Sequence, residues 1–119
     1  MREILFRGKA KDGKWYFGDL VQFKSGLVYI QSKEENASNY VIPETVGQFT
    51  GLTDKNGKKL FEGDIVRVDK DGDILEIMYC ERGYFCANNN AWWEFIDELG
   101  AFEVIGNIHD NPELLEVAE

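Results

Sequence analysis

The segment Gly51–Lys59, which reads GLTDKNGKK, is the part of the chain that comes closest to a phosphate-binding loop. Such a loop places four residues between its glycines and a Ser or Thr directly after its Lys. Here five residues separate Gly51 from Gly57, and Lys58 is followed by Lys59. Asn56-Gly57 is instead typical of a two-residue hairpin turn. The segment therefore predicts a hairpin, and we expect no nucleotide cofactor.

Metal ligands are suggested at two places, but neither has the required spacing. The acidic segment Asp69–Asp73 has carboxylates at alternate positions, like the first ligands of a calcium loop. That loop also needs Gly at its sixth position and Glu at its twelfth, where this chain has Ile74 and Cys80. His109, Cys80 and Cys86 could bind zinc, but they show no CxxC spacing. We expect a solvated hairpin turn in the acidic segment and no metal site.

Residue patterns for catalysis are also missing. A nucleophilic triad needs a base positioned beside Ser or Cys, whereas the chain has one His, His109, and no GxSxG motif. Glu62 and Asp64 flank Gly63, but two neighbouring carboxylates do not by themselves define an acid–base pair. We therefore expect no catalytic residue, and a protein that is not an enzyme.

Aromatic side chains are the more informative class. Trp15-Tyr16 and Trp92-Trp93 are adjacent pairs, and neighbouring residues of a strand point to opposite faces. If these segments are extended, the rings cannot all enter one core. Trp15, Tyr16, Trp92 and Trp93 are therefore the candidate interaction surface for a protein partner. The alternative is that a junction between two sub-domains buries all of them.

The two cysteines flank a predicted hairpin turn. Cys80 and Cys86 lie on either side of a segment that contains Arg82-Gly83, so they could face each other across it. A reducing compartment favours thiols over a disulfide. We expect two buried thiols, although the sequence leaves the pairing open.

Charge is unevenly distributed along the chain. Its formal net charge is −9; residues 1–33 carry seven basic and three acidic side chains, and residues 34–119 carry six basic and nineteen acidic ones. Nucleic-acid binding needs a clustered positive field, so nucleic acid is a weaker expectation than a protein partner or self-association. Two nucleic-acid roles remain open: contact through the basic N-terminal region, or an acidic surface that mimics nucleic acid and captures a host DNA-binding protein.

No segment suits a membrane or an export signal. The longest run without a charged residue, Gly83–Trp93, has eleven residues, which is too short to cross a bilayer. The first twenty residues contain charges throughout and lack the apolar centre of a signal peptide. We expect a cytoplasmic protein.

Turn signals divide the chain into short strands. Asn-Gly and Asp-Gly pairs supply the positive φ angles of tight hairpins, and strands recurring at this spacing predict an all-β fold. Two segments favour helices. Ala91–Leu99 has apolar residues at helical spacing, although Trp92, Glu94 and Ile96 also alternate as in a strand, so the strand stays open as the alternative. Pro112–Val117 would be capped by Asn111. Gly106, inside an apolar run, predicts a bulge or a barrel corner. The predicted strands are Glu3–Lys9, Lys14–Gln22, Leu27–Gln31, Tyr40–Pro43, Gly47–Leu52, Asp64–Val68, Ile74–Tyr79 and Tyr84–Ala87.

From Met1 to Leu115 the chain resembles the YopX family, whose members are encoded largely by phages and prophages of Gram-positive bacteria. The motifs that carry this resemblance occur in order along the chain. They are Met1–Ile4 with Phe6-Arg7, Trp15 and Gly18, Thr45–Leu52, Asp54–Lys58, Glu62–Val66, Val104–Ile108 and Asn111–Leu114.

The resemblance implies an all-β fold, with an N-terminal β region at residues 1–55 and a small SH3-like barrel with a short terminal helix at residues 56–119. It implies no cofactor and no catalytic set. SH3-like barrels commonly bind peptides in an aromatic-lined groove. We therefore expect a phage or prophage protein-interaction module, with a nucleic-acid-related role as the alternative.

Overall fold

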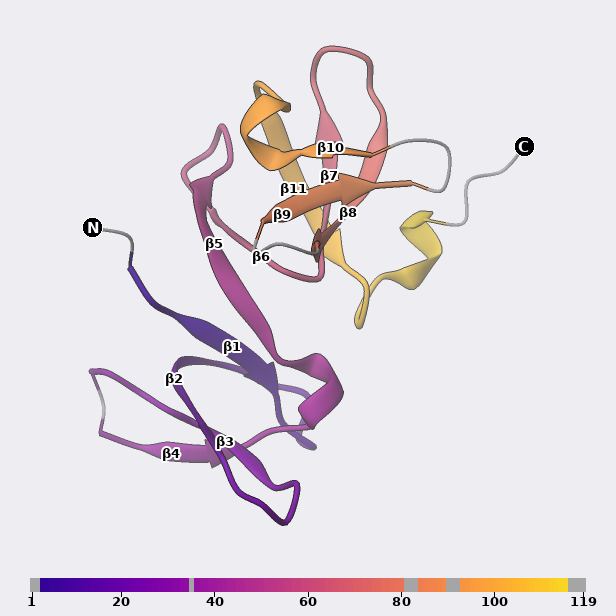
Figure 1. The fold of residues 1–119 in the computed structure, drawn as a ribbon. Coiled ribbons are helices and arrows are strands. Elements are labelled where there is room, and N and C mark those ends of the chain that lie inside the picture. The colour runs from indigo at the N-terminus through magenta and orange to yellow at the C-terminus, as the bar shows by residue number, and fades with distance from the viewer. Residues whose placement is uncertain (1–2, 35, 81–83, 90–92, 116–119) are drawn as a thin grey trace. The chain divides into compact units, whose positions relative to one another are not determined.

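The computed structural model describes residues 3–34, 36–80, 84–89 and 93–115. Over these residues the fold is all-β, as predicted: short antiparallel strands are joined by turns and by short 3₁₀ helices (Figure 1). No helix in the described part of the chain is long and apolar enough to cross a membrane. The strands are β1 (Phe6–Lys9), β2 (Trp15–Gln22), β3 (Val28–Gln31), β4 (Ser38–Tyr40), β5 (Gly47–Thr53), β6 (Lys59–Phe61), β7 (Asp64–Val68), β8 (Ile74–Tyr79), β9 (Phe85–Asn88), β10 (Trp93–Phe95) and β11 (Phe102–Asn107).

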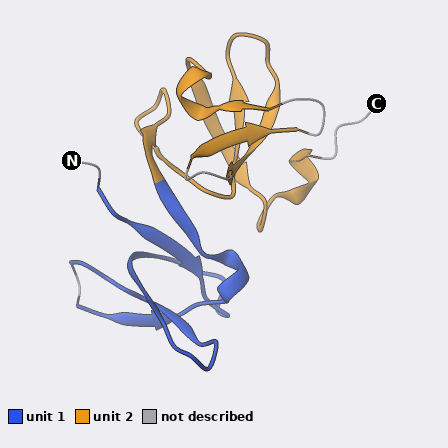
Figure 2. Ribbon diagram, in the orientation of Figure 1, with its two compact units in different colours: residues 1–49 blue, residues 50–119 orange. Residues whose placement is uncertain are grey.

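The chain forms two compact units, residues 1–49 and residues 50–119 (Figure 2). The division falls within β5, which continues from the first unit into the second and pairs there with β6. The sequence-based boundary after Lys55 lies in the turn between these two strands. A sequence pattern locates such a turn more readily than a division inside a continuous strand.

In the first unit the strand order is β4-β3-β2-β1-β5. The first half of β2 pairs with β1 and its second half pairs with β3. Gly18 lies where the partner changes, and a Cβ atom there would collide with the carbonyl oxygen of Gln31. Buried Val28, Ile30 and Val41 form the centre of the core, so this unit has a small interior.

The second unit holds the larger core and a sheet with the order β10-β9-β8-β7-β11. The register of β11 against β7 shifts between Val104 and Gly106, which confirms the irregularity predicted at this glycine. The buried residues of the core come from most of the unit's strands: Leu60, Val66, Val68, Leu75, Ile77, Phe85, Ala87, Ile96, Leu99 and Phe102. The structure has an antiparallel sheet of five strands in this order. Its closure into an SH3-like barrel stays a prediction.

The helix predicted at Ala91–Leu99 is wrong for the residues that are described. Trp93–Phe95 is strand β10, which pairs antiparallel with β9, and Ile96–Glu98 is a 3₁₀ helix. The alternation of Trp93, Glu94 and Phe95 competes with the helical spacing, and pairing with β9 satisfies the backbone of the extended form. Residues 90–92 lie outside the described part.

The predicted terminal helix Pro112–Val117 is also not confirmed. The structure has one 3₁₀ segment at Pro112–Leu115, and residues 116–119 are not described. Asn111, the expected N-cap, accepts a hydrogen bond from the backbone N–H of Asn107 at 3.3 Å through its Oδ1. Its side chain therefore closes the preceding turn instead of starting an α-helix.

Candidate functional site

One row of residues crosses the sheet of the second unit from edge to edge. Gly106, Ile65, Glu76, Asn88 and Trp93 are successive cross-strand partners on β11, β7, β8, β9 and β10. Directly opposite residues of an antiparallel pair have their side chains on the same face, so this row defines one side of the sheet. The other side carries core residues of β8 and β9.

The 3₁₀ segment Pro112–Leu115 covers one end of this row. A Cβ atom on Gly106 would lie 2.6 Å from Oδ1 of Asn111 and 2.9 Å from Cδ1 of Leu114, so the segment packs directly on β11. Ile65 is fully buried although it is on this side of the sheet. The 3₁₀ segment also contacts β8. Trp93 and Phe95 on β10 are exposed, so among the described residues the part over β9 and β10 is open.

The open part is lined almost entirely by aromatic and sulfur-containing side chains around a pocket of about 480 Å³. We call this surface the aromatic face. Its members share one side because Met78 and Phe95 are both partners of Cys86, and Asn88 is the partner of Trp93. The residues of the aromatic face are Met78, Cys80, Tyr84, Cys86, Asn88, Trp93 and Phe95.

Three rings of the aromatic face contact one another and remain accessible. The centroids of Trp93 and Phe95 are 5.2 Å apart with the rings at 80°, and those of Tyr84 and Phe95 are 5.7 Å apart at 63°. This edge-to-face arrangement is a favourable one for aromatic pairs. The exposed fractions are 57% for Trp93, 60% for Tyr84 and 39% for Phe95. A contiguous ring cluster with this much exposed apolar area is typical of a binding surface.

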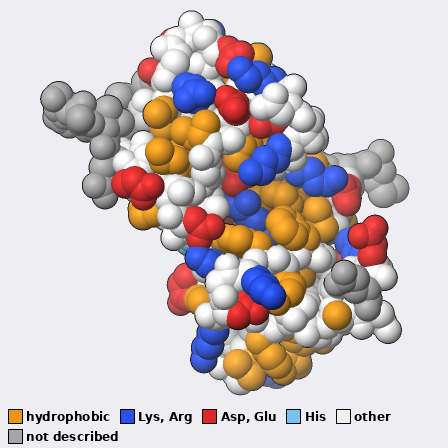
Figure 3. All heavy atoms as spheres, turned by 180° about the vertical axis from the view of Figure 1, so that it is seen from behind, with side chains coloured by type: hydrophobic (Ala, Val, Ile, Leu, Met, Phe, Trp, Pro, Cys, Tyr) orange, Lys and Arg blue, Asp and Glu red, His pale blue; other side chains and the backbone are white. Residues whose placement is uncertain are grey.

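Exposed hydrophobic atoms alone would not mark a site. Figure 3 shows hydrophobic side chains among acidic and basic ones over one whole face of the molecule, and such scattered exposure is normal for soluble proteins. Phe23, Tyr29 and Tyr40 form another contiguous ring cluster in the first unit. The aromatic face differs because all three of its contacting rings, Tyr84, Trp93 and Phe95, line one pocket.

The four residues predicted as an interaction surface lie in different environments. Trp93 belongs to the aromatic face, and Trp92 lies outside the described residues. In the first unit the guanidinium of buried Arg7 lies 4.8 Å from the centre of the Trp15 ring. Tyr16 packs against the core on the other side of β2 and donates a hydrogen bond to Asp12 at 3.2 Å. Trp15 and Tyr16 therefore do not share a face.

Sequence reasoning missed most of the aromatic face. The predicted helix Ala91–Leu99 includes Phe95. On the strand that is observed, Phe95 lies two residues from Trp93 and its side chain is on the same face. Tyr84 enters the face only through the hairpin between β8 and β9. The alternation of Trp93 and Phe95 was the available signal, and it becomes decisive only when the pairing with β9 is known.

A second pocket, of about 840 Å³, lies in the first unit. Tyr40 and Leu27 are exposed at its margin, and Tyr16 contributes to its lining. Its polar residues include Lys11, Asp12 and Asn39. Its volume is larger than that of the pocket at the aromatic face, but its lining residues do not include a contiguous cluster of rings.

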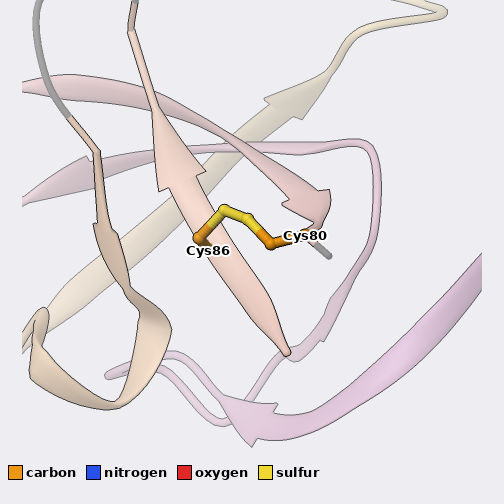
Figure 4. Close-up of a disulfide and its surroundings, with 2 residues drawn as sticks. All are labelled: Cys80 and Cys86. Carbon is orange, nitrogen blue, oxygen red and sulfur yellow. A yellow bond between two sulfur atoms is a disulfide. The ribbon is translucent and has the colours of Figure 1, made fainter. Parts of the chain in front are cut away.

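The expectation of two thiols is wrong: Cys80 and Cys86 form a disulfide (Figure 4). The backbone N–H of Cys80 donates to the carbonyl of Tyr84 at 2.7 Å, so Tyr84 is opposite Cys80 while Cys86 is opposite Met78. The cysteines are thus diagonal neighbours on one face, with Cα atoms 6.1 Å apart, within disulfide range. The expectation rested on cellular compartment, which does not determine this geometry.

Asp54, in the segment that resembled a phosphate loop, has a structural role. Its carboxylate accepts hydrogen bonds from the backbone N–H groups of Asn56, Lys58 and Val104 at 2.9, 2.8 and 3.0 Å. Burial alone would raise the pKa of Asp54, but the three donors and nearby Lys58 outweigh it and lower the pKa. The carboxylate closes the β5–β6 turn and fastens it to β11.

The other acidic motifs are also used by turns. Asp64 is buried and accepts a hydrogen bond from the backbone N–H of Phe61 at 2.8 Å. Asp71 accepts one from the N–H of Asp73 at 3.0 Å, which agrees with the predicted hairpin turn. Within the described residues, no group of three or more His, Cys, Asp or Glu side chains is arranged to hold a metal ion.

Among the described residues of β8, β9 and β10, Glu76 is the carboxylate on the same side of the sheet as the aromatic face. It lies one strand from Asn88 and two strands from Trp93 in the row described above. No described residue forms a hydrogen bond or an ion pair with its carboxylate. Desolvation by burial raises its pKa above the usual value, because a partly dehydrated carboxylate without a donor is less stable in its charged form.

The comparisons with known proteins extend over nearly the whole chain. The model of a family described as "YopX protein" matches residues 5–116. Among solved structures, protein EF1440 from Enterococcus faecalis is similar, with 26% sequence identity and a TM-score of 0.58; the match covers 97% of this chain and 99% of that one. No curated protein matches the chain.

Proposed function

Because the chain belongs to the YopX family, we propose that it is a phage- or prophage-encoded interaction module without enzymatic activity, which binds a protein partner through its aromatic face. The observation that carries the proposal is the cluster of Tyr84, Trp93 and Phe95 over the open part of a sheet. Large aromatic side chains supply most of the binding energy at many protein interfaces. We place this activity in the bacterial cytoplasm.

The position of β10 supports the same role. β10 ends the strand order of the second unit, so among the described strands its outer edge has no neighbour. An edge strand can pair with an extended segment of another chain, whose side chains then reach adjacent pockets. A second copy of the chain is therefore an alternative partner to a host or phage protein.

The test compares capture of proteins from host-cell lysate by the full chain and by two variants. Trp93→Ala removes the centre of the aromatic face. Phe23→Ala is a matched control because Phe23 is likewise an exposed aromatic residue that contacts another ring, that of Tyr29, but it belongs to the first unit. We expect at least one protein to be retained by the wild type and by Phe23→Ala but lost with Trp93→Ala. Unchanged melting temperatures would show that both variants fold.

Size-exclusion chromatography with light scattering covers self-association. A dimer that dissociates only in Trp93→Ala would identify a second copy as the partner. If capture and molecular mass are the same for all three proteins, the aromatic face is not an interaction surface and the proposal is wrong.

A nucleic-acid-related role is the second candidate, and charge favours one form of it. Residues 50–119 carry six basic and sixteen acidic side chains, whereas residues 1–49 carry seven basic and six acidic ones. The first unit thus has little net positive charge with which to contact phosphates. The acidic second unit suits capture of a basic DNA-binding protein better, and this form predicts binding that weakens steeply with salt.

A further inference from the structure

The net charge of the unit that contains the aromatic face favours a cationic partner. The second unit has a net charge of −10, from six basic and sixteen acidic residues. At least three of its six basic side chains are already engaged in ion pairs: Lys55 with Asp69, Arg67 with Glu103 and Lys70 with Glu94, at 2.9 to 3.2 Å. An approaching cation therefore meets a negative field with few competing positive charges.

Glu76 gives this field a specific point beside the rings. Glu76 is half-buried, and no described residue donates a hydrogen bond to its carboxylate to offset the desolvation. A cation placed against it would supply the missing partner and would interact more strongly than at a fully hydrated carboxylate.

Trp93 supplies the second contact that a cation needs. An indole ring binds a guanidinium over its face, and arginine does this more readily than lysine because its planar group also stacks. The chain itself contains this contact, between Arg7 and Trp15 at 4.8 Å. Trp93 is sufficiently exposed to make the same contact with another molecule.

The spacing of the row fits one guanidinium. Glu76, Asn88 and Trp93 are consecutive partners on three neighbouring strands, and strands lie about 4.8 Å apart. Asn88, between the carboxylate and the indole, has a short side chain whose amide oxygen can also accept a hydrogen bond. A guanidinium above Asn88 can therefore reach all three side chains at once.

We propose that the aromatic face binds an extended protein segment that carries an arginine beside apolar side chains, with the guanidinium between Glu76 and Trp93 and an apolar neighbour in the pocket beside Met78 and Phe95. This inference rests on the proposed function and specifies its partner. It assigns separate tasks to two residues: Trp93 contributes to the binding of any apolar segment, and Glu76 selects the cation.

The experiment selects binders from a random peptide library with the immobilised full chain. The wild type, Trp93→Ala, Glu76→Gln and the control Phe23→Ala are used in parallel. Glu76→Gln keeps the shape of the side chain and removes its charge. We expect the wild type and Phe23→Ala to enrich peptides with arginine next to apolar residues, Glu76→Gln to enrich apolar peptides without arginine, and Trp93→Ala to enrich neither.

Affinity measurements on the best synthetic peptide complete the test. Replacing its arginine by glutamine, or Glu76 by Gln, should each weaken binding about tenfold, and the two changes together should cost little more than one. This non-additivity indicates a direct contact. Lysine in place of the arginine should bind with intermediate affinity.

The possible results separate the two proposals. Peptides that depend on Trp93 but show no preference for arginine would overturn this inference and leave the proposed function standing. Enrichment that is the same for wild type and Trp93→Ala, or no enrichment at all, would overturn both. Arginine-bearing peptides whose affinity does not change in Glu76→Gln would also contradict the assigned role of Glu76.

Discussion

At the scale of single residues, the motifs that look most like chemistry are mostly parts of turns. Asp54 accepts three backbone hydrogen bonds, and Asp64 and Asp71 each accept at least one. Short polar side chains are well suited to this because their oxygens reach N–H groups that a tight turn leaves unsatisfied. In two of the YopX-like motifs, Asp54–Lys58 and Glu62–Val66, a carboxylate therefore has a structural role.

Asp54→Asn should destabilise the protein by about 2 kcal/mol at neutral pH, because charge-assisted hydrogen bonds to the backbone are weakened and an amide nitrogen can face a backbone N–H. The pKa of Asp54 is lowered in the folded state. Its contribution is therefore fully present above the pKa of the unfolded chain and is lost as the pH falls through the lower folded pKa. Urea unfolding between neutral pH and strongly acidic pH measures this.

The control for Asp54 is Asp97→Asn, the same change at an exposed carboxylate. We expect Asp97→Asn to follow the wild-type pH dependence, and Asp54→Asn to show a smaller loss of stability in acid. Equal acid-induced losses for wild type and Asp54→Asn would show that Asp54 does not carry this dependence.

Gly18→Ala should lower the free energy of unfolding by about 3 kcal/mol, since a Cβ atom there overlaps the backbone of Gln31 and β2 and β3 must separate. Gly26→Ala is the matched control. Gly26 has a positive φ of 98° but open space around it, so its substitution should cost about 1 kcal/mol through backbone strain alone. Chemical denaturation of both variants compares the two effects, and a similar cost for both would reject the close approach at Gly18.

At the scale of elements, alternation and turn residues predicted much of the fold. Asn56-Gly57, Asp71-Gly72 and the apolar alternation in Asp64–Val68 each correspond to an observed turn or strand. The prediction failed at Trp93–Phe95 because three residues fit a strand and a helix almost equally well. Pairing with β9, which the local sequence does not contain, decides between them. The aromatic face depends on the same pairing and was missed for the same reason.

The disulfide can be tested at this scale because it joins the end of β8 to β9. Removing it in Cys80→Ser/Cys86→Ser should lower the free energy of unfolding by about 2 kcal/mol, which is the loop-closure cost for a short loop. Denaturation of both proteins under non-reducing conditions gives the difference. Alkylation of the denatured wild type before and after reduction, followed by mass measurement, should modify cysteine only after reduction; modification beforehand would contradict the disulfide.

At the scale of the whole molecule, the chain combines two units of unequal interior and unequal charge. The buried cluster of the second unit contains ten residues, and that of the first unit is centred on three. The second unit carries a net charge of −10, whereas the first carries +1. Composition predicted a single small β-rich protein and an uneven charge, but it could not show that one unit would hold both the main core and the aromatic face.

This division predicts that residues 50–119 fold without the rest of the chain. Every residue of the larger core lies within this range, as do the five strands of its sheet, the disulfide and the hydrogen bonds that the Asp54 carboxylate accepts. A domain of this size buries a limited apolar area, so the disulfide adds a useful constraint.

We expect the fragment to show a β-type circular-dichroism spectrum and cooperative urea unfolding, whereas residues 1–49 alone should lack a cooperative transition. Binding of the arginine-bearing peptide by fragment 50–119 would then place recognition in this unit. An unfolded fragment would instead show that the second unit depends on contacts with residues 1–49.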